Sequence, residues 1–303
     1  MTQYPLGTLA IVLVTYNRLE LLKDCLFSLM NQTYPIDKVI IINNASTDGT
    51  IEFLNGFNDL PLHIISESCN TGGAGGFYKG VKTAFEQGFD WVFLMDDDVY
   101  PDKDCLEKLM KFRMGAMIAV REDKQGKLVE RSAIKYDLKN PIFPNPKRNS
   151  ISDCYQQRNQ MPETVIVDNV AFEGFMIHRE IIKKVGFPEP KYFIFYDDVD
   201  YALRIRALGY KITAIRDAIL VRQLDFNQKA ALNSWKAYYM FRNLFHIHYK
   251  FGENFLVRNK PYLLALATIS LAVLCGNIKR AQAIFNALQD FKILEDNSTK
   301  GKR

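Results

Sequence analysis

Three consecutive carboxylates, Asp96, Asp97 and Asp98, directly follow an apolar run that begins at Trp91. In an extended segment alternate side chains share a face, so we expect Asp96 and Asp98 to point together and Asp97 to point away. Two carboxylates on one side suit a hard divalent cation such as Mg2+ or Mn2+, which nucleotide enzymes hold with one or two carboxylates plus phosphate oxygens. The alternative interpretation is a solvated acidic turn, or a cap for the helix expected within residues 101–110.

The glycine-rich stretch "NTGGAGGFYKG", residues 70–80, leads into a predicted helix. Without side chains the backbone can approach a ligand closely, and a helix N-terminus favours anions. The stretch matches neither the GxGxxG nor the GxxxxGK[ST] phosphate-binding pattern. A tight turn that binds no ligand is therefore the alternative.

A second acidic cluster, Asp197, Asp198 and Asp200, begins a predicted helix beside several aromatic residues. A carboxylate in such surroundings could act as a general base. Capping of the helix by Asp197 or Asp198 accounts for the pattern equally well. The four histidines form no cluster in the sequence.

The elements that must position these groups alternate along the first hundred residues. Apolar runs rich in β-branched residues begin near residues 9, 38, 62 and 91, and each of the first three is followed by a helical pattern, with Ser46 or Thr47 as the cap of the second helix. This alternation predicts a doubly wound parallel sheet. In such sheets ligands bind beyond the carboxyl ends of the strands. The polar clusters fall at those ends: residues 15–17, 43–48, 70–76 and 96–98.

The second half of the chain divides into a less regular part and a helical part. Residues 138–150 are rich in Pro and Asn, which predicts a loop, whereas residues 165–186 and 192–212 resume strand and helix patterns, the last helix ending at Gly209. From about Phe226 the pattern is helical. We therefore divide the chain into a catalytic domain, 1–225, and a C-terminal region, 226–303.

The C-terminal region is strongly basic. Residues 226–303 carry 12 Lys+Arg and 4 Asp+Glu, whereas residues 1–225 carry 27 and 30. Residues 261–275 are almost entirely apolar but shorter than the ~20 residues that span a bilayer, and basic residues lie on both sides of them. We expect a helix in the interface of an anionic membrane and no nucleic-acid partner; a helix buried in a core or oligomer is the alternative.

Two observations bear on the compartment. The first residues lack a basic start followed by a long apolar run, so we expect no signal peptide. The five cysteines form no CxxC pair, which favours a reducing compartment. Together they predict a cytoplasmic protein, peripheral on the inner face of the cell membrane.

Several segments together resemble the family 2 glycosyltransferases of the GT-A fold. They are "IVLVTYNR", "IINNASTDGT", "NTGGAGGF", "MDDDV" and "YFIFYDDVDYALRIRALGYKI", and the resemblance spans about residues 8–245, including "AYYMFRN". The glycine loop and the second acidic cluster look most like bacterial galactofuranosyltransferases and rhamnosyltransferase-like enzymes. The resemblance implies a mostly parallel sheet flanked by helices, with a helical C-terminal extension.

The resemblance also implies an inverting, metal-dependent transferase. Asp96 and Asp98 match the metal-binding positions, Asp97 the position near the ribose, and Asp198 the catalytic base. UDP-galactofuranose is the expected donor, with dTDP-rhamnose or another UDP-hexose as alternatives, and the expected acceptor is lipid-linked or a polysaccharide. The positions that match the nucleoside-binding and donor-lining loops are Thr15, Tyr16, Asn17, Arg18, Asn44, Asp48 and Asn70 to Gly76, among them Gly72 and Gly73.

One departure concerns the metal. The family often supplies a metal-binding histidine where this chain has Arg222 or Gln223, so two alternatives replace the third protein ligand: Arg222 contacts the diphosphate directly, or water completes the coordination of the metal. A copy that binds sugar nucleotide without turnover is a second hypothesis. A sugar nucleotidyltransferase ranks low, because its chemistry needs a glycine-rich basic loop where this chain has "TYNRLE". The sequence leaves a homo-oligomer open.

Overall fold

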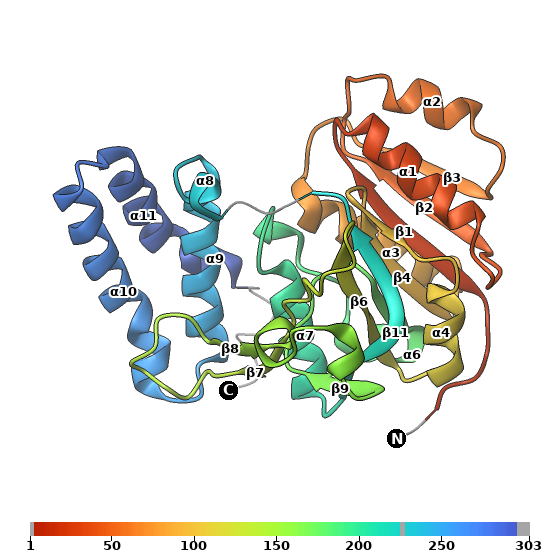
Figure 1. The fold of residues 1–303 in the computed structure, drawn as a ribbon. Helices are drawn as coiled ribbons and strands as arrows, with labels where there is room; N and C mark the ends of the chain where they lie inside the picture. The colour runs from red at the N-terminus through yellow and green to blue at the C-terminus, as the bar shows by residue number, and fades with distance from the viewer. Residues whose placement is uncertain (1–2, 225–227, 296–303) are drawn as a thin grey trace.

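The computed structural model describes residues 3–224 and 228–295. Its first hundred residues confirm the alternating pattern (Figure 1). The strands lie parallel in the order β3-β2-β1-β4. The elements are β1 (Leu9–Thr15), α1 (Leu19–Met30), β2 (Lys38–Asn43), α2 (Thr50–Gly56), β3 (Leu62–Ser66), α3 (Gly72–Glu86) and β4 (Trp91–Asp96).

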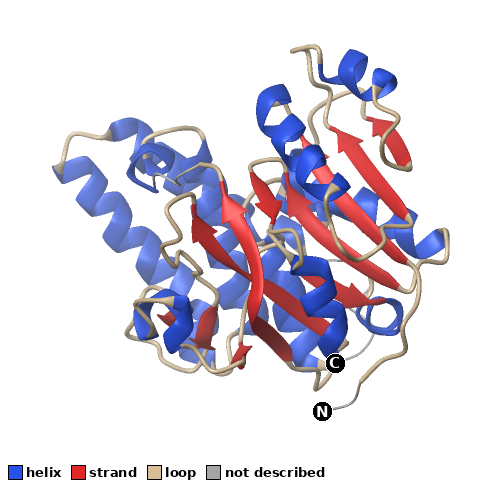
Figure 2. Cartoon of the chain, turned by 45° about the vertical axis from the view of Figure 1, so that its right-hand side comes forward, coloured by secondary structure: helices blue, strands red, loops and turns tan. Residues whose placement is uncertain are grey.

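Alternation along the strands creates two cores, one on each face of the sheet. Ala10, Val12 and Val14 of β1 belong to one buried cluster, whereas Leu9 and the next alternate residues belong to the other. Helices cover both faces (Figure 2). Because Val14 pairs with Asp96 and Thr15 with Asn43, the strand ends that carry polar residues lie at one edge.

Beyond β4 the sheet is mixed, and the parallel arrangement predicted for the first hundred residues does not extend past that strand. Strand β10 lies antiparallel between β4 and β6, and β5 and β9 are antiparallel to β11, while β11 is parallel to β6. The elements are β5 (Val99–Pro101), α4 (Cys105–Phe112), β6 (Ala116–Asp123), β9 (Thr164–Val167), β10 (Phe175–His178), α6 (Arg179–Val185), α7 (Asp197–Ala207) and β11 (Ile212–Arg222).

The structure differs from three local predictions. Gly49, rather than Ser46 or Thr47, precedes α2, and the carboxylate of Asp48 accepts hydrogen bonds from Thr50. The glycine-rich stretch is the first part of α3 itself. The expected loop contains β8 (Lys147–Ser150), which pairs with β7 (Ala133–Tyr136) and precedes α5 (Ile151–Cys154).

The C-terminal helices stand beside the sheet as a group (Figure 1). They are α8 (Gln228–Leu232), α9 (Lys236–Phe251), α10 (Phe255–Leu274) and α11 (Ile278–Asp290), followed by the 3-10 turn η3 (Phe291–Leu294). Phe245, Ile284 and Phe291 are among the side chains of their common core. The expected domain boundary at 225/226 falls outside the described residues.

The apolar stretch 261–275 lies almost wholly in α10, and the helix is only partly buried. Val257, Ala265 and Ala272 are buried, whereas Leu263, Leu266 and Leu274 are 71%, 66% and 85% exposed. A helix buried on all sides is therefore excluded within this chain. None of the described helices combines the length and the apolarity needed to cross a membrane.

Candidate active site

A cleft of about 820 Å³ opens at the carboxyl edge of the sheet. This volume lies within the range of about 300–1,000 Å³ that is usual for small-molecule sites. The cleft brings both acidic clusters together with the glycine-rich start of α3 and with residues of α8 and α9. Of the predicted site residues, its lining includes Thr15, Tyr16, Arg18, Asn44, Asn70, Gly72, Gly73, Asp96, Asp97, Asp98 and Asp198.

Asp97 is tied to the end of β1. Strand β4 ends at Asp96, and Asp97 and Asp98 lie in the turn that follows. The Asp97 carboxylate accepts hydrogen bonds from the Thr15 hydroxyl at 2.8 Å and from the Tyr16 amide at 3.3 Å. Arg18 Nη1 bridges Asp97 and Asp98 at 3.0 and 2.9 Å. The expectation that Asp97 points away from its neighbours is therefore wrong, because the segment turns instead of continuing extended.

The acidic triplet is crowded with negative charge. Burial, together with the neighbouring carboxylates Asp98 and Glu173, raises the pKa of Asp96 well above its usual range. Burial and Glu173 also raise the pKa of Asp98, against the opposing effect of Arg18. Burial raises the pKa of Asp97 to about 6, although Arg18 and Thr15 oppose the rise. A cation in this cleft would relieve the repulsion.

The residues present fit a divalent cation that a diphosphate helps to hold. Asp96 and Asp98 supply hard carboxylate oxygens, the ligand type that Mg2+ and Mn2+ prefer. Across residues 3–224 and 228–295, no group of three or more His, Cys, Asp and Glu side chains is arranged to hold a metal ion by itself. Asp96 and Asp98 alone would therefore leave a cation to complete its coordination with oxygens from a ligand or from water.

The structure distinguishes Arg222 from Gln223. Arg222 ends β11, lines the cleft and donates through Nη2 to both carboxylate oxygens of Glu173 at 3.0 and 3.1 Å. Gln223 instead directs its side-chain amide to the carbonyl of Leu21. Burial alone would raise the pKa of Glu173, but Arg121 and Arg222 outweigh it and hold that pKa below its usual value. Glu173 therefore stays ionised beside the acidic triplet.

Asp198 lies in the first turn of α7 and reaches the cleft. One of its carboxylate oxygens accepts a hydrogen bond from the Val199 amide at 2.7 Å. Burial raises the pKa of Asp198 to about 6, while the Val199 amide and the nearby Lys147 ammonium oppose the rise. A carboxylate with that pKa is ionised at neutral pH and still basic enough to accept a proton. Asp197 also lines the cleft, and burial raises its pKa well above the usual range.

Two of the predicted nucleoside-binding residues do not line the cleft. The Asn17 side chain accepts a hydrogen bond from the Thr47 amide at 2.7 Å, which ties the loop after β1 to the loop after β2. Asp48 accepts from the Leu19 amide at 3.0 Å, at the start of α1. These two residues therefore hold the loops that line the cleft and do not line it themselves.

The glycine-rich start of α3 has a packing requirement of its own. Gly72 has a φ of +73°, and a Cβ there would collide with the backbone carbonyl of Phe193. Asn44, buried at the end of β2, donates to the Gly72 carbonyl and accepts from the Thr71 hydroxyl at 2.9 Å each. Asn70 accepts from the Gly72 amide at 2.8 Å. The glycine therefore permits close packing in addition to any contact with a ligand.

The cleft also uses residues that sequence reasoning missed. Trp235 and Lys236, at the start of α9, form part of its wall, and Phe193 stacks on Tyr239 with ring centres 4.9 Å apart. Trp235 is 59% exposed. Glu173 could have been identified as a candidate site residue, because it is a lone acid in the apolar stretch "VAFEGFMI". Trp235 carried no local signal, because its position depends on how the C-terminal helices pack.

Comparisons with known proteins identify the family of the chain. The family model "Glycosyl transferase family 2" matches residues 10–186. Glycosyltransferase AglE of Haloferax volcanii is 26% identical over 69% of this chain and 65% of its own length. Galactofuranosyltransferase GlfT1 of Mycolicibacterium smegmatis is 25% identical over 65% of each chain. The chain thus covers slightly less than two thirds of the length of these relatives.

Solved structures share the fold at low sequence identity. A mannosyltransferase from Pyrobaculum calidifontis, in complex with GDP-Man and Mn2+, aligns with a TM-score of 0.55 and 21% identity over 96% of this chain and 77% of its own. Staphylococcus aureus TarS 1-349 with UDP-GlcNAc aligns with a TM-score of 0.56 and 17% identity over 95% and 81%. The fold is the GT-A fold, and the chain belongs to glycosyl transferase family 2.

Proposed function

We propose that the protein is an inverting glycosyltransferase that uses a nucleotide-activated sugar and a divalent cation. One observation carries the proposal: a single cleft holds the Asp96–Asp98 triplet, after β4, together with Asp198, at the start of α7. The first suits a metal-bound diphosphate, and the second suits deprotonation of an attacking hydroxyl. Family membership supports the same reading.

Each side chain then has a defined task. Thr15, Tyr16 and Arg18 fix Asp97 at the nucleoside end, while Asp96 and Asp98 would hold the cation, which supplies a positive charge to the departing diphosphate. Asp198 accepts the proton of the acceptor hydroxyl as the hydroxyl oxygen bonds to the anomeric carbon. The bond from that carbon to the diphosphate breaks on the opposite face, so one displacement inverts the configuration.

The donor we favour is UDP-galactofuranose, because GlfT1 is among the relatives and the glycine loop and second acidic cluster resemble galactofuranosyltransferases. A dTDP-rhamnose or another UDP-hexose is the alternative within the family. For the acceptor we favour a lipid-linked or polysaccharide glycan. The exposed ring of Trp235 offers a flat apolar surface to a sugar, and Lys236 Nζ lies 6.0 Å from the centre of that ring.

We further propose a peripheral position on the inner face of the cell membrane. Large apolar side chains are exposed along α10, among them Phe255, Leu263, Leu266 and Leu274. The C-terminal region carries the excess of Lys and Arg that an anionic surface attracts. A lipid-linked acceptor would then lie in the same membrane as the enzyme.

The test is thermal stabilisation by Mn2+ with a panel of UDP-, dTDP- and GDP-sugars, on wild type and Asp98→Ala, followed by donor turnover. A ligand of the folded state raises the melting temperature by mass action. We expect one nucleotide class to stabilise wild type and not Asp98→Ala, and turnover to be lost in Asp198→Asn while donor binding remains. Background turnover in both wild type and Asp198→Asn would favour a non-catalytic sugar-nucleotide-binding homologue.

A further inference from the structure

The chain enters the helix that carries Asp198 through a strained loop, residues 193–196. Phe193, Phe195 and Tyr196 each have a φ of +66°. This left-handed region is unfavourable for residues with a side chain, and bulky residues occupy it only where their surroundings hold them there. The loop position, and with it the start of α7, must therefore be fixed by contacts from elsewhere.

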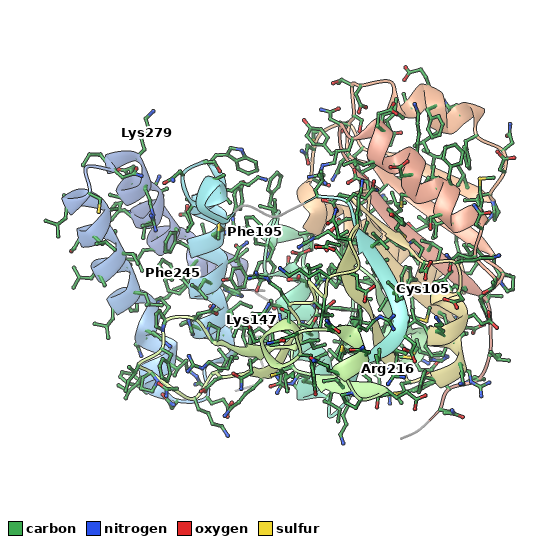
Figure 3. All side chains as sticks on the ribbon, in the orientation of Figure 1. Cys105, Lys147, Phe195, Arg216, Phe245 and Lys279 are labelled. Carbon is green, nitrogen blue, oxygen red and sulfur yellow. The ribbon has the colours of Figure 1, made fainter. Side chains whose placement is uncertain are left out.

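Asn243 of α9 supplies those contacts to the loop backbone. Its side chain is fully buried. Its Nδ2 atom lies within hydrogen-bond distance of three carbonyl oxygens of the loop, those of Tyr192, Ile194 and Phe195, at 3.1, 2.8 and 2.8 Å. The two N–H bonds of the amide are shared among these three acceptors. Buried carbonyls outside helices and strands need donors, and one amide group serves three of them here. Figure 3 shows Phe195 between the C-terminal helices and the sheet.

Arg242 fixes the orientation of that amide. Its Nε atom donates to Asn243 Oδ1 at 2.9 Å, so the amide nitrogen must face the loop. Its Nη2 atom donates to the carbonyls of Lys191 and Tyr192 at 2.8 and 2.9 Å. From the opposite side, the amide of Ala74 donates to the Phe193 carbonyl at 3.1 Å. The loop is thus held between α9 and the start of α3.

We propose that Arg242 and Asn243 are a positioning pair that places Asp198 for proton transfer. The proposal rests on the proposed function, in which Asp198 is the base. Neither residue of the pair is among those that line the cleft, so both act through the loop. Asp96, at the end of β4, and Asp98, in the turn after it, are not held by this pair. Loss of the pair should therefore impair turnover and leave donor binding intact.

The experiment compares Asn243→Leu and Asn243→Asp with wild type, using the donor that the panel identifies. Asn243→Asp keeps the shape but turns a donating nitrogen into an oxygen that faces three carbonyls. Phe245→Leu is the matched control, since Phe245 is equally buried in α9 but packs against Phe241 and Phe291 (Figure 3). Should the Asn243 variants fail to fold, Arg242→Lys removes the paired contacts from a half-buried position.

We expect the donor Kd to stay within about threefold of wild type while kcat falls by ~100-fold, the cost of displacing a catalytic group by about 1 Å. Arg242→Lys should lose ~10-fold. The acidic limb of the pH profile should also move to lower pH, because a displaced, better solvated Asp198 regains an ordinary pKa. An unchanged kcat and pH limb in folded variants, or an equal loss in Phe245→Leu, would overturn the positioning role. An inactive wild type would overturn the proposed function and this role with it.

Discussion

We expect the substitution of Arg222 by Gln to change the affinity for a divalent cation and the affinity for the donor in opposite directions. Arg222 and Gln223 are the two residues at the place where the family resemblance leads us to expect a metal-binding histidine, and of the two Arg222 lines the cleft. Arg222 also lowers the pKa values of both Asp98 and Glu173. Its removal leaves Glu173 with Arg121 as its remaining partner. The cleft then becomes more negative, so it should attract a free divalent cation more strongly and a donor diphosphate more weakly.

The magnitude for the donor follows from the type of contact. A charge-assisted hydrogen bond contributes ~1.5–3 kcal/mol. If the guanidinium of Arg222 binds the diphosphate, Arg222→Gln should therefore raise the donor Kd by ~10- to 100-fold. Arg222→Lys keeps the charge but loses the planar guanidinium whose Nη2 atom donates to both oxygens of Glu173, so we expect a smaller loss.

The assay is calorimetric titration at pH 8 with Mn2+ alone and then with donor plus saturating Mn2+. Wild type should retain Mn2+ weakly in the absence of donor, because the protein offers Asp96 and Asp98 as its ligands. Arg222→His, which restores an imidazole beside them, should bind Mn2+ alone more tightly than Arg222→Gln. Tight Mn2+ binding by donor-free wild type, or a wild-type donor Kd in Arg222→Gln, would refute the reasoning.

Two further predictions concern the base and the glycine loop. Because burial raises the pKa of Asp198 to about 6, kcat at saturating Mn2+, donor and acceptor should fall ~10-fold per pH unit below that value as the base gains its proton. The limb should vanish in the residual activity of Asp198→Asn; a limb that persists there would assign the base elsewhere. Gly72→Ala should lower the free energy of unfolding by ~2 kcal/mol or more, because Ala is disfavoured at a φ of +73° and collides with the Phe193 carbonyl. Gly73→Ala, with no atom near its added methyl group, should be neutral or slightly stabilising. Equal melting temperatures for the two variants would show that the loop relaxes around the added carbon.

The sequence could predict the fold of the first hundred residues because the signals there are local. The apolar runs of β1, β2 and β4 are continuous, and each is followed by a helical period or a polar cluster, so the common edge of the sheet follows from parallel pairing. Asp96, Asp97 and Asp98 could be placed at that edge for the same reason. The directions in which these three side chains point could not be predicted, because they depend on whether the segment stays extended or turns after Asp96.

Other features depend on long-range structure. Strand β10 has four residues, and its apolar pattern is the same whether it pairs parallel or antiparallel. The choice between Arg222 and Gln223 depends on the phase of β11, which a register shift between Ile215 and Ile219 changes. Trp235 reaches the cleft only because α9 packs against the loop before α7. Neither the hydrophobic period nor the residue spacing of one sequence predicts such strand pairing, register shifts or helix packing.

The packing of α9 changes how the C-terminal region must be tested. The division at 225/226 suggests a catalytic domain with a separable membrane anchor, but Asn243 and Trp235 from beyond that boundary hold or line the cleft. A chain truncated there would lose loop contacts as well as any anchor. Loss of activity after truncation would therefore not test the proposed membrane contact.

Surface substitutions on α10 separate the proposed membrane contact from the contribution of the C-terminal region to the cleft. Leu263 and Leu266 are 71% and 66% exposed, so Leu→Ser at both should leave the fold and the turnover of water-soluble substrates unchanged. Burial of one leucine contributes ~1.5–3 kcal/mol, and even partial burial of two predicts at least a ~10-fold loss of binding to vesicles that contain anionic lipid. Leu6→Ser, a 60% exposed position on the sheet side, is the matched control and should bind as wild type does. Cosedimentation that is equal for all three proteins would remove α10 as the membrane contact and leave its apolar face to another partner.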